Sequence, residues 1–248
     1  FSLSKAHRET TRSDFENNIN IQPEELIDYE LGWKYNAEKF LFNSNLYYMS
    51  YKNQLVLTGA LDDVGSPIRE NSGKSYRTGI ELESVYKATN KLNISANISL
   101  SENKNVDYKT NYNGVITDWG DTDISFSPNV ISSAGIQFSA SQDLTFTLLN
   151  KFVGNQYMSN TESNISKLSS YSTTDLNILY TIKNSAYFSE IIVTAMINNI
   201  FDKEYVSNGF YYTYDDTWSD PNLITTIEGT GYYPQAKRNF LLGLTFKL

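Results

Sequence analysis

The feature that most constrains the fold is a run of ten residues in which apolar and polar side chains alternate without exception. From Leu92 to Ser101 every even position is apolar and every odd position is polar. Strict alternation places the two kinds of side chain on opposite faces of an extended strand. Strands of soluble proteins usually have about 5–6 residues, whereas a strand that crosses a bilayer needs about 9–11. The run therefore favours a transmembrane β-strand over a strand of a soluble sandwich.

Ten segments of the chain have the pattern of strands, and the connections between them are of two unequal kinds. The segments cover 1–6, 25–35, 40–57, 75–87, 92–103, 130–140, 144–153, 171–182, 190–201 and 237–248. Tight turns at 36–39, 89–90, 142–143 and 184–185 alternate with long connections at 8–24, 58–74, 104–129, 154–170 and 202–236. Outer-membrane barrels have short periplasmic turns and long extracellular loops. We therefore expect an all-β fold, an antiparallel transmembrane β-barrel, with Leu248 at the periplasmic rim.

The composition agrees with a barrel and excludes several other classes. The mean hydropathy is -0.42, yet the chain has 19 Tyr and 13 Phe, and these cluster near the predicted strand ends, as they do at both membrane interfaces of barrels. No stretch of about 18 apolar residues could form a transmembrane helix. The absence of cysteine excludes disulfides and thiolate metal sites. The net charge of -8 argues against nucleic acid as a partner.

Three stretches share their order and their distance from the C-terminus with a known family. An Arg-rich stretch from Ala6 to Phe15 precedes a Pro-Glu step and the sequence Tyr-Glu-Leu-Gly at 29–32. Residues 198–205 read Asn-Asn-Ile-Phe-Asp-Lys-Glu-Tyr, and residues 233–240 read Tyr-Pro-Gln-Ala-Lys-Arg-Asn-Phe. Together these stretches resemble the TonB-dependent receptors of the outer membrane, especially those of Bacteroidetes type.

This resemblance implies a larger protein and an import function. The family's barrel has 22 strands around a plug, so residues 1–248 are expected to be the C-terminal portion with about the last ten strands. The plug domain and the N-terminal strands would lie upstream of Phe1. The implied function is TonB-energised uptake of a scarce nutrient, first of all an iron–siderophore, with TonB acting through the absent plug region. Lumen-facing Glu81, Glu83 and Asn97 are candidates for bonds to that plug.

The last segment carries a second implied role. Apolar side chains alternate along it, with Gly243, Thr245 and Lys247 on the opposite face. This pattern resembles the insertion signal that the barrel assembly machinery reads, although that signal commonly ends in Phe and this chain ends in Leu. The predicted insertion signal is Phe240, Gly243, Leu244, Phe246 and Leu248.

Aromatic residues of the long connections are the candidates for ligand contact. Aromatic rings offer a large rigid area, and Tyr and Trp add a polar tip, which suits catecholate, hydroxamate or sugar ligands. Packing within the loops is the alternative explanation. The predicted ligand-binding residues are Tyr112, Trp119, Tyr211, Tyr212, Tyr214 and Trp218.

The sequence offers little support for other functions. A passive porin-like barrel remains open, as does a ten-strand outer-membrane protease that would use His7 with Glu9 and Asp14 at the rim. A soluble β-rich binding protein is the third alternative. The single histidine rules out a His-rich metal centre, and the acidic run at 215–220 lacks the spacing of a calcium loop. We expect no cofactor, no metal and no catalytic residue.

Overall fold

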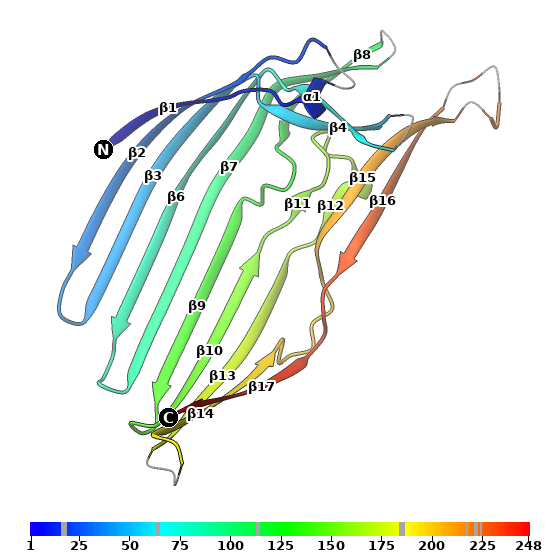
Figure 1. Ribbon diagram of the computed structural model, residues 1–248. Helices are drawn as coiled ribbons and strands as arrows, with labels where there is room; N and C mark the ends of the chain where they lie inside the picture. The colour runs from blue at the N-terminus through cyan, green and yellow to red at the C-terminus, as the bar shows by residue number, and fades with distance from the viewer. Residues whose placement is uncertain are drawn as a thin grey trace.

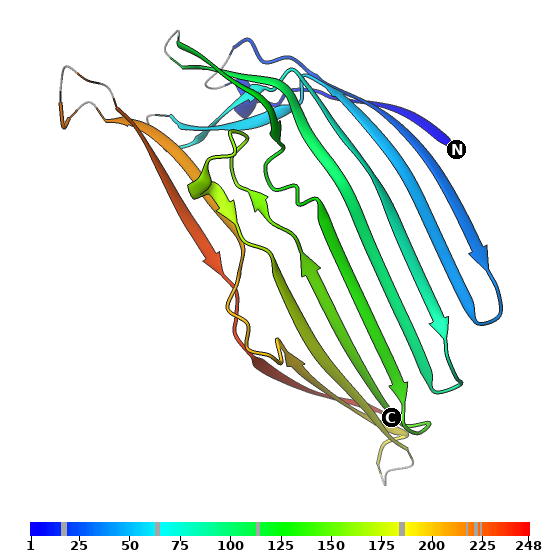
Figure 2. The ribbon, with the colours of Figure 1, turned by 180° about the vertical axis from the view of Figure 1, so that it is seen from behind.

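The protein is described by a computed structural model that covers residues 1–15, 19–62, 65–112, 115–183, 187–216, 218–220, 223 and 225–248. Its main element is a curved antiparallel sheet in which neighbouring strands lie side by side (Figures 1 and 2). In order across the sheet, the strands are β1 (Ser2–Arg8), β2 (Glu24–Asn36), β3 (Phe40–Lys52), β6 (Lys74–Lys87), β7 (Leu92–Tyr112), β9 (Val130–Ser139), β10 (Leu144–Val153), β13 (Tyr171–Lys183), β14 (Glu190–Asn198) and β17 (Asn239–Lys247).

Shorter elements occupy the long connections. They are α1 (Arg12–Phe15), β4 (Leu55–Leu61), β5 (Pro67–Asn71), β8 (Val115–Asp123), β11 (Gln156–Tyr157), η1 (Asn164–Ser166), β12 (Lys167–Leu168), β15 (Val206–Asp216) and β16 (Thr225–Pro234). In Figure 1, α1, β4 and β8 lie at the upper end of the sheet, and β15 and β16 lie along the right-hand side. Of the helices in the described ranges, none has both the length and the apolar character needed to cross a membrane.

The prediction of ten antiparallel strands in sequence order is confirmed, since each predicted segment supplies one strand of the sheet path. Among the described residues, β1 and β17 are the two ends of this path and do not pair with each other. The C-terminus lies at the end of the sheet that carries the tight turns (Figure 1). The turn predicted at 184–185 lies outside the described residues.

Two predicted strands end earlier than expected. The segment 40–57 is not one strand: β3 ends at Lys52, Asn53 has a φ of 58°, and the chain turns away into β4. In the same way, β14 ends at Asn198 because Asn199 has a φ of 51°. Asn tolerates this left-handed conformation better than other residues with a side chain. The connections 104–129 and 202–236 were expected to be loops, but each contains strands.

The register of the sheet separates apolar from polar side chains over many strands. One row runs through Leu31, Leu46, Ile80, Leu100 and Val130, which are direct cross-strand neighbours. The adjacent row on the other face runs through Gly32, Asn45, Glu81, Ser99 and Ile131. The apolar row is largely exposed, with Leu31 at 55% and Leu100 at 41%. A soluble sheet would cover this face, whereas a barrel presents it to lipid.

Aromatic side chains form two groups on the apolar face. One group joins Tyr29 to Tyr48 and Tyr48 to Tyr76, with ring centroids 6.4 and 6.1 Å apart. The second lies nearer the tight turns, where the ring centroids of Trp33 and Phe42 are 5.6 Å apart. Two aromatic groups at opposite ends of the strands are the arrangement expected for girdles at the two membrane interfaces.

The last strand presents the predicted insertion-signal residues on both of its faces. Phe240, Leu244 and Phe246 lie on the apolar face and are 72%, 56% and 52% exposed. Gly243 is the cross-strand neighbour of Thr194 and lies on the opposite face. Leu248 follows the last residue of β17 and is exposed. The structure thus matches the expected alternation, while the role of these residues in assembly stays a prediction.

Candidate functional site

The described residues of the long connections pack together at the end of the sheet opposite the tight turns, and we call this body the loop assembly (residues 53–62, 65–73, 104–112, 115–129, 154–170, 199–216, 218–220, 223 and 225–238). Its largest part is a four-stranded sheet in the order β16-β15-β4-β5. Strands β15 and β4 pair in parallel at Thr213 and Ala60. Two connections that are far apart in sequence are therefore joined directly by backbone pairing.

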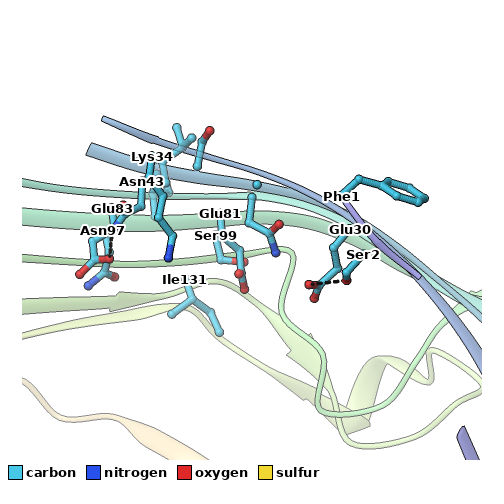
Figure 3. Close-up of a pocket in the computed structure, with 15 residues that line it drawn as sticks. Phe1, Ser2, Glu30, Lys34, Asn43, Glu81, Glu83, Asn97, Ser99 and Ile131 are labelled. Atoms are coloured by element: carbon cyan, nitrogen blue, oxygen red, sulfur yellow. Dashed lines mark hydrogen bonds between the residues drawn. The ribbon is translucent and has the colours of Figure 1, made fainter. Parts of the chain in front are cut away.

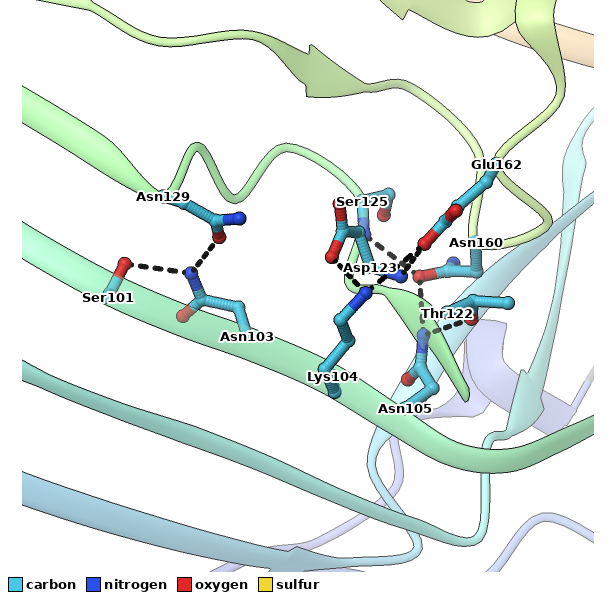
Figure 4. A network of polar contacts seen from close by, with 10 residues as sticks. All are labelled: Ser101, Asn103, Lys104, Asn105, Thr122, Asp123, Ser125, Asn129, Asn160 and Glu162. Carbon is cyan, nitrogen blue, oxygen red and sulfur yellow. Dashed lines mark hydrogen bonds and ion pairs between the residues drawn. The ribbon is translucent and has the colours of Figure 1, made fainter. Parts of the chain in front are cut away.

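Asn160 is a polar hub of this loop assembly (Figure 4). Its side-chain nitrogen donates to the backbone carbonyl of Leu57 at 3.1 Å. Its oxygen accepts from the Asn105 side chain at 3.3 Å and from the Ser125 backbone N–H at 3.0 Å. Asn105 also donates to Thr122 at 3.3 Å. Asn160 and Asn105 are fully buried, so these bonds satisfy the Asn160 amide and the Asn105 amide nitrogen, which would otherwise be costly to bury, while the Asn105 amide oxygen has no hydrogen-bond partner among the described residues.

An ion-pair network beside this hub holds the same segments together. Lys104 on β7 lies 2.7 Å from the carboxylate of Asp123 and 3.5 Å from that of Glu162. Glu162 also accepts a 2.5 Å hydrogen bond from the Asp123 backbone N–H. Each of the three side chains is more than half covered. Because Lys104 pairs with both Asp123 and Glu162, connection 154–170 is held against the β7–β8 hairpin.

Two tyrosine–glutamate pairs join further strands of the loop assembly. The hydroxyl of Tyr108, which is 0% exposed, donates to Glu70 on β5 at 3.0 Å. Burial raises the pKa of the Tyr108 hydroxyl and that of the Glu70 carboxyl. The hydroxyl of Tyr211 on β15 donates to Glu228 on β16 at 2.5 Å. Burial raises the pKa of Tyr211 too, and the bond to Glu228 adds to this rise.

Asp14 links the first long connection to the same body. Its carboxylate accepts hydrogen bonds of 2.8 Å from both the N–H and the hydroxyl of Thr11. It also lies 3.6 Å from Arg8 and 3.5 Å from Arg69 on β5. The hydrogen bond from the Thr11 backbone is the main cause of a lowered pKa of Asp14, and the two guanidinium groups contribute. Asp14 is therefore a structural anion.

The arrangement around His7 does not match the protease alternative. His7 is the cross-strand neighbour of Glu25, and its Nδ1 lies 3.9 Å from the Glu25 carboxylate. Asp14 is instead held by Thr11 and the two arginines. No described contact brings His7 and Asp14 together as an acid–base pair.

The predicted ligand-binding tyrosines of β15 lie on two different faces of the β15–β16 hairpin. Tyr211 packs over Gly59 of β4, where one of its ring carbons would be 2.8 Å from a Cβ on that glycine. Gly59 has a φ of +90°, so both its conformation and the close ring require glycine. Tyr212 and Tyr214 occupy the opposite face and stack on each other, with ring centroids 6.4 Å apart.

The face with Tyr212 and Tyr214 is a continuous aromatic row. Phe210 lies 6.1 Å from Tyr212 between ring centroids. A Cβ on Gly229 would lie 2.3 Å from the ring of Tyr212, and one on Gly231 would lie 2.2 Å from the ring of Phe210. The two glycines thus let the rings lie directly on the backbone of β16. This row is a partly exposed aromatic surface, and its residues lie in the aromatic run at 210–214 that the sequence singles out.

The other three predicted residues are more dispersed. Trp119 on β8 is partly exposed, and its indole N–H donates to Thr110 at 3.0 Å. Trp218 is 91% exposed, and its backbone N–H donates to Asp216 at 2.9 Å. The side chain of Tyr112 lies outside those that the structure describes. Among the described residues, no ring contact joins Trp119 or Trp218 to the aromatic residues of β15.

The acidic groups of the loops have structural partners. Asp118 pairs with Lys109 at 2.8 Å and accepts from the Gly120 N–H, and both contacts lower the pKa of Asp118. Asp216 accepts from Ser219 at 2.6 Å as well as from the Trp218 backbone, which lowers the pKa of Asp216. Within the described part of the chain, no group of three or more His, Asp or Glu side chains is placed to hold a metal ion.

The polar face of the main sheet lines a broad hollow below the loop assembly (Figure 3). Its volume is about 1030 Å³. Asn43 donates to Glu83 at 2.9 Å, and Asn97 donates to Ser133 at 2.8 Å. Glu81 also lines this hollow. The side chains of Glu81, Glu83 and Asn97 therefore lie on the polar face of the sheet, as expected.

The residues that hold the loop assembly together were not identified in the sequence. Asn160, Glu162 and Glu70 lie in connections without periodic patterns, and their partners are 35 to 103 positions away. Asp14 lies in the Arg-rich stretch that carried the family resemblance. That resemblance was the one feature of the sequence that could have identified it.

Comparison with protein families gives one match that covers most of the chain. Residues 2–200 match a family model described as "TonB dependent receptor-like, beta-barrel". A search among curated proteins gives no match.

Comparison with solved structures gives the same fold at low sequence identity. The chain is similar to the siderophore receptor PiuA from Acinetobacter baumannii, with a TM-score of 0.67 and 19% identity over 93% of this chain and 30% of that one. The copper transporter OprC gives a TM-score of 0.70 and 17% identity, over 98% and 36%. The ferric-catecholate import receptor Fiu from E. coli K12 gives 0.63 and 16%, over 96% and 29%. The chain spans about a third of the length of these structures.

Proposed function

The chain belongs to the TonB-dependent receptor β-barrel family, and we propose that it forms part of a receptor that imports a scarce nutrient, an iron–siderophore complex, with energy from TonB. Members of this family are integral proteins of the bacterial outer membrane. The observation that carries the proposal is the family match over residues 2–200 on a ten-strand sheet with a loop assembly at one end. PiuA is a siderophore receptor and Fiu a ferric-catecholate import receptor, and their similarity to this chain supports an iron–siderophore as the ligand.

The proposal includes the rest of the barrel. The described sheet has two unpaired edges and corresponds to about a third of the similar structures. We therefore propose that residues 1–248 are the C-terminal part of a 22-strand barrel around a plug, through which TonB acts. The insertion signal on β17 would be read by the barrel assembly machinery. No step of this import requires covalent chemistry by the chain.

The loop assembly and the polar hollow would act at successive steps of import. The aromatic row of Phe210, Tyr212 and Tyr214 offers stacking area at the extracellular end. The hollow below it is lined by carboxylates and amides, which suit a hydrated passage or a plug surface. The ligand would be held by the loops first and would then pass along the polar face toward the periplasm.

An uptake experiment with the full-length receptor tests the proposal. Cells that carry the receptor as their sole TonB-dependent protein are grown under iron limitation and supplied with radioactive iron as ferric tris-catecholate or ferric trihydroxamate complexes. The expected result is accumulation of at least one complex, which stops when TonB is deleted. Accumulation that persists without TonB would support a passive porin instead. No accumulation of either complex would overturn iron–siderophore as the ligand.

A further inference from the structure

A second, smaller cavity lies inside the loop assembly, next to the extracellular end of β13. Its volume is about 310 Å³, which is at the lower end of the range for ligand pockets, about 300–1,000 Å³. It is bounded on one side by β12 and the two residues that follow it, and on the other by the turn after β14. The polar residues that line it are Lys167, Ser169, Ser170, Lys203, Glu204, Tyr205 and Tyr232.

The charge balance of this cavity is positive. Neither Lys167 nor Lys203 has an ion-pair partner among the described residues. The ammonium group of Lys167 lies 5.7 Å from the ring centroid of Tyr157. The one carboxylate in the lining, Glu204, is paired with Lys237 outside the lining. Two lysines without a carboxylate partner among the described residues therefore line a cavity in a chain whose net charge is -8.

Neutral hydrogen-bond donors line the same cavity as the two lysines. The hydroxyls of Ser169 and Ser170 have no hydrogen-bond partner within the described ranges, so their protons are available to a ligand. Ammonium and hydroxyl groups together match the oxygen atoms of an anion, because hydrogen bonds to a charged acceptor are stronger than those to a neutral one.

Both walls of the cavity are held in place before any ligand arrives. Asn199 accepts from the Lys203 N–H at 2.9 Å and donates to the Lys203 carbonyl at 2.8 Å. On the opposite wall, the Ser170 N–H donates to Asn155 at 2.7 Å. The ring of Tyr205 stacks on that of Tyr171, with centroids 4.4 Å apart. Fixed backbones reduce the entropy cost of binding, which favours a site over two mobile surface lysines.

We infer that this cavity binds an anionic, oxygen-rich group of the imported ligand, such as a catecholate, carboxylate or phosphate. The inference rests on the proposed function, since it assigns one contact of the ligand in that import. The cavity has room for one such group and not for a whole ferric complex. Lys167 and Lys203 would neutralise the anion, and the serine hydroxyls would orient it.

Binding measurements on the purified full-length receptor test this site. The variant Lys167→Gln/Lys203→Gln removes both charges and keeps the side-chain length. Lys109→Gln is the matched control, because Lys109 lies in the loop assembly but is paired with Asp118. The probes are an anionic ferric tris-catecholate complex and a neutral ferric trihydroxamate complex.

The double variant is expected to bind the anionic complex at least about tenfold more weakly and the neutral complex as tightly as wild type. The loss should shrink at high salt, since it is a loss of charge interactions. The control variant should match wild type with both probes. Equal affinity of the double variant and wild type for the anionic complex would overturn the site, as would an equal loss for both complexes.

A second arm separates this inference from the proposed function. Inorganic phosphate is added to the same receptors, and its ³¹P line width is measured. If wild type binds neither ferric complex, the iron–siderophore proposal fails, but the phosphate arm still decides the site. Broadening with wild type that the double variant loses would support an anion site. Equal line widths with wild type and the double variant would overturn it.

Discussion

The hydroxyl of Tyr108 donates a 3.0 Å hydrogen bond to the carboxylate of Glu70, and this contact joins two connections of the barrel across 38 positions of sequence. Tyr108 belongs to the part of β7 that extends beyond the predicted strand, and Glu70 lies on β5. The pair is one of several buried polar contacts that make the loops a single body. If the loops bind the ligand, these contacts decide how rigid the binding surface is.

Removing the hydroxyl of Tyr108 should loosen the connection that carries β4 and β5. In Tyr108→Phe the Glu70 carboxylate loses its donor in a largely buried position, which costs about 1–3 kcal/mol. We expect faster proteolytic cleavage within residues 58–74 of the receptor in membrane vesicles. Tyr214→Phe is the control, because Tyr214 is half exposed and makes no described hydrogen bond through its hydroxyl. Equal cleavage rates in both variants would contradict the role of the pair.

Asn160→Ala should release three segments of the loop assembly at once. The substitution removes the bonds to Leu57, Asn105 and Ser125 and leaves buried groups without partners, a loss of about 1–3 kcal/mol for each unsatisfied group. Hydrogen exchange should rise in residues 154–170 and around Leu57. The temperature at which the barrel loses its heat-resistant mobility on gels should stay unchanged, because the hub lies outside the membrane-spanning strands. A drop in that temperature would show that the hub also supports the barrel.

Acidification should loosen the first long connection through Asp14. The pKa of Asp14 is lowered in the folded state below its ordinary value of 3.8. Its contribution to stability is therefore complete above that ordinary value and is lost as the pH falls through the lower folded value. Pepsin cleavage between residues 8 and 15 should accelerate over this window in wild type. The Asp14→Asn variant should be cleaved quickly already near pH 3.8, the upper limit of this window, and its cleavage rate should change little as the pH falls further. A wild type and variant with the same pH profile would refute this explanation.

A charge on the apolar face of β17 should block membrane insertion. Leu244 faces outward beside Val193, whereas Thr245 lies on the opposite face beside Ile192. Lysine on the lipid face of a barrel costs about 2–4 kcal/mol near the midplane. We expect Leu244→Lys to fold poorly into lipid vesicles and Thr245→Lys to fold as wild type does. Equal folding yields would show that this face does not contact lipid.

The insertion-signal prediction needs a separate readout, because Leu244 serves both roles in our interpretation. Leu244→Ala keeps the position apolar, so folding of the purified protein into vesicles should be nearly normal. In cells, the same variant should assemble more slowly if the assembly machinery reads this residue. Normal assembly in cells would remove Leu244 from the predicted signal.

The strands of the main sheet were readable from the sequence because their pattern is local. Alternation from Leu92 to Ser101 identifies both faces of β7 without reference to any other strand. The same reading failed at Asn53 and Asn199, where one residue with a positive φ ends a strand inside an apolar run. Hydropathy does not register a change of backbone conformation, so these ends required the structure.

The sequence by itself determined the ten strands, their order, the two faces of the sheet and the family, since each depends on a local pattern or a motif. Only the tertiary structure decided how the loops are built. Asn160 meets Leu57 from 103 positions away, and Tyr211 donates to Glu228 while Tyr212 stacks on Tyr214 on the other face of β15. Polar groups in loops have no periodic spacing, and their partners are chosen by whichever buried donors and acceptors the fold brings within hydrogen-bonding distance.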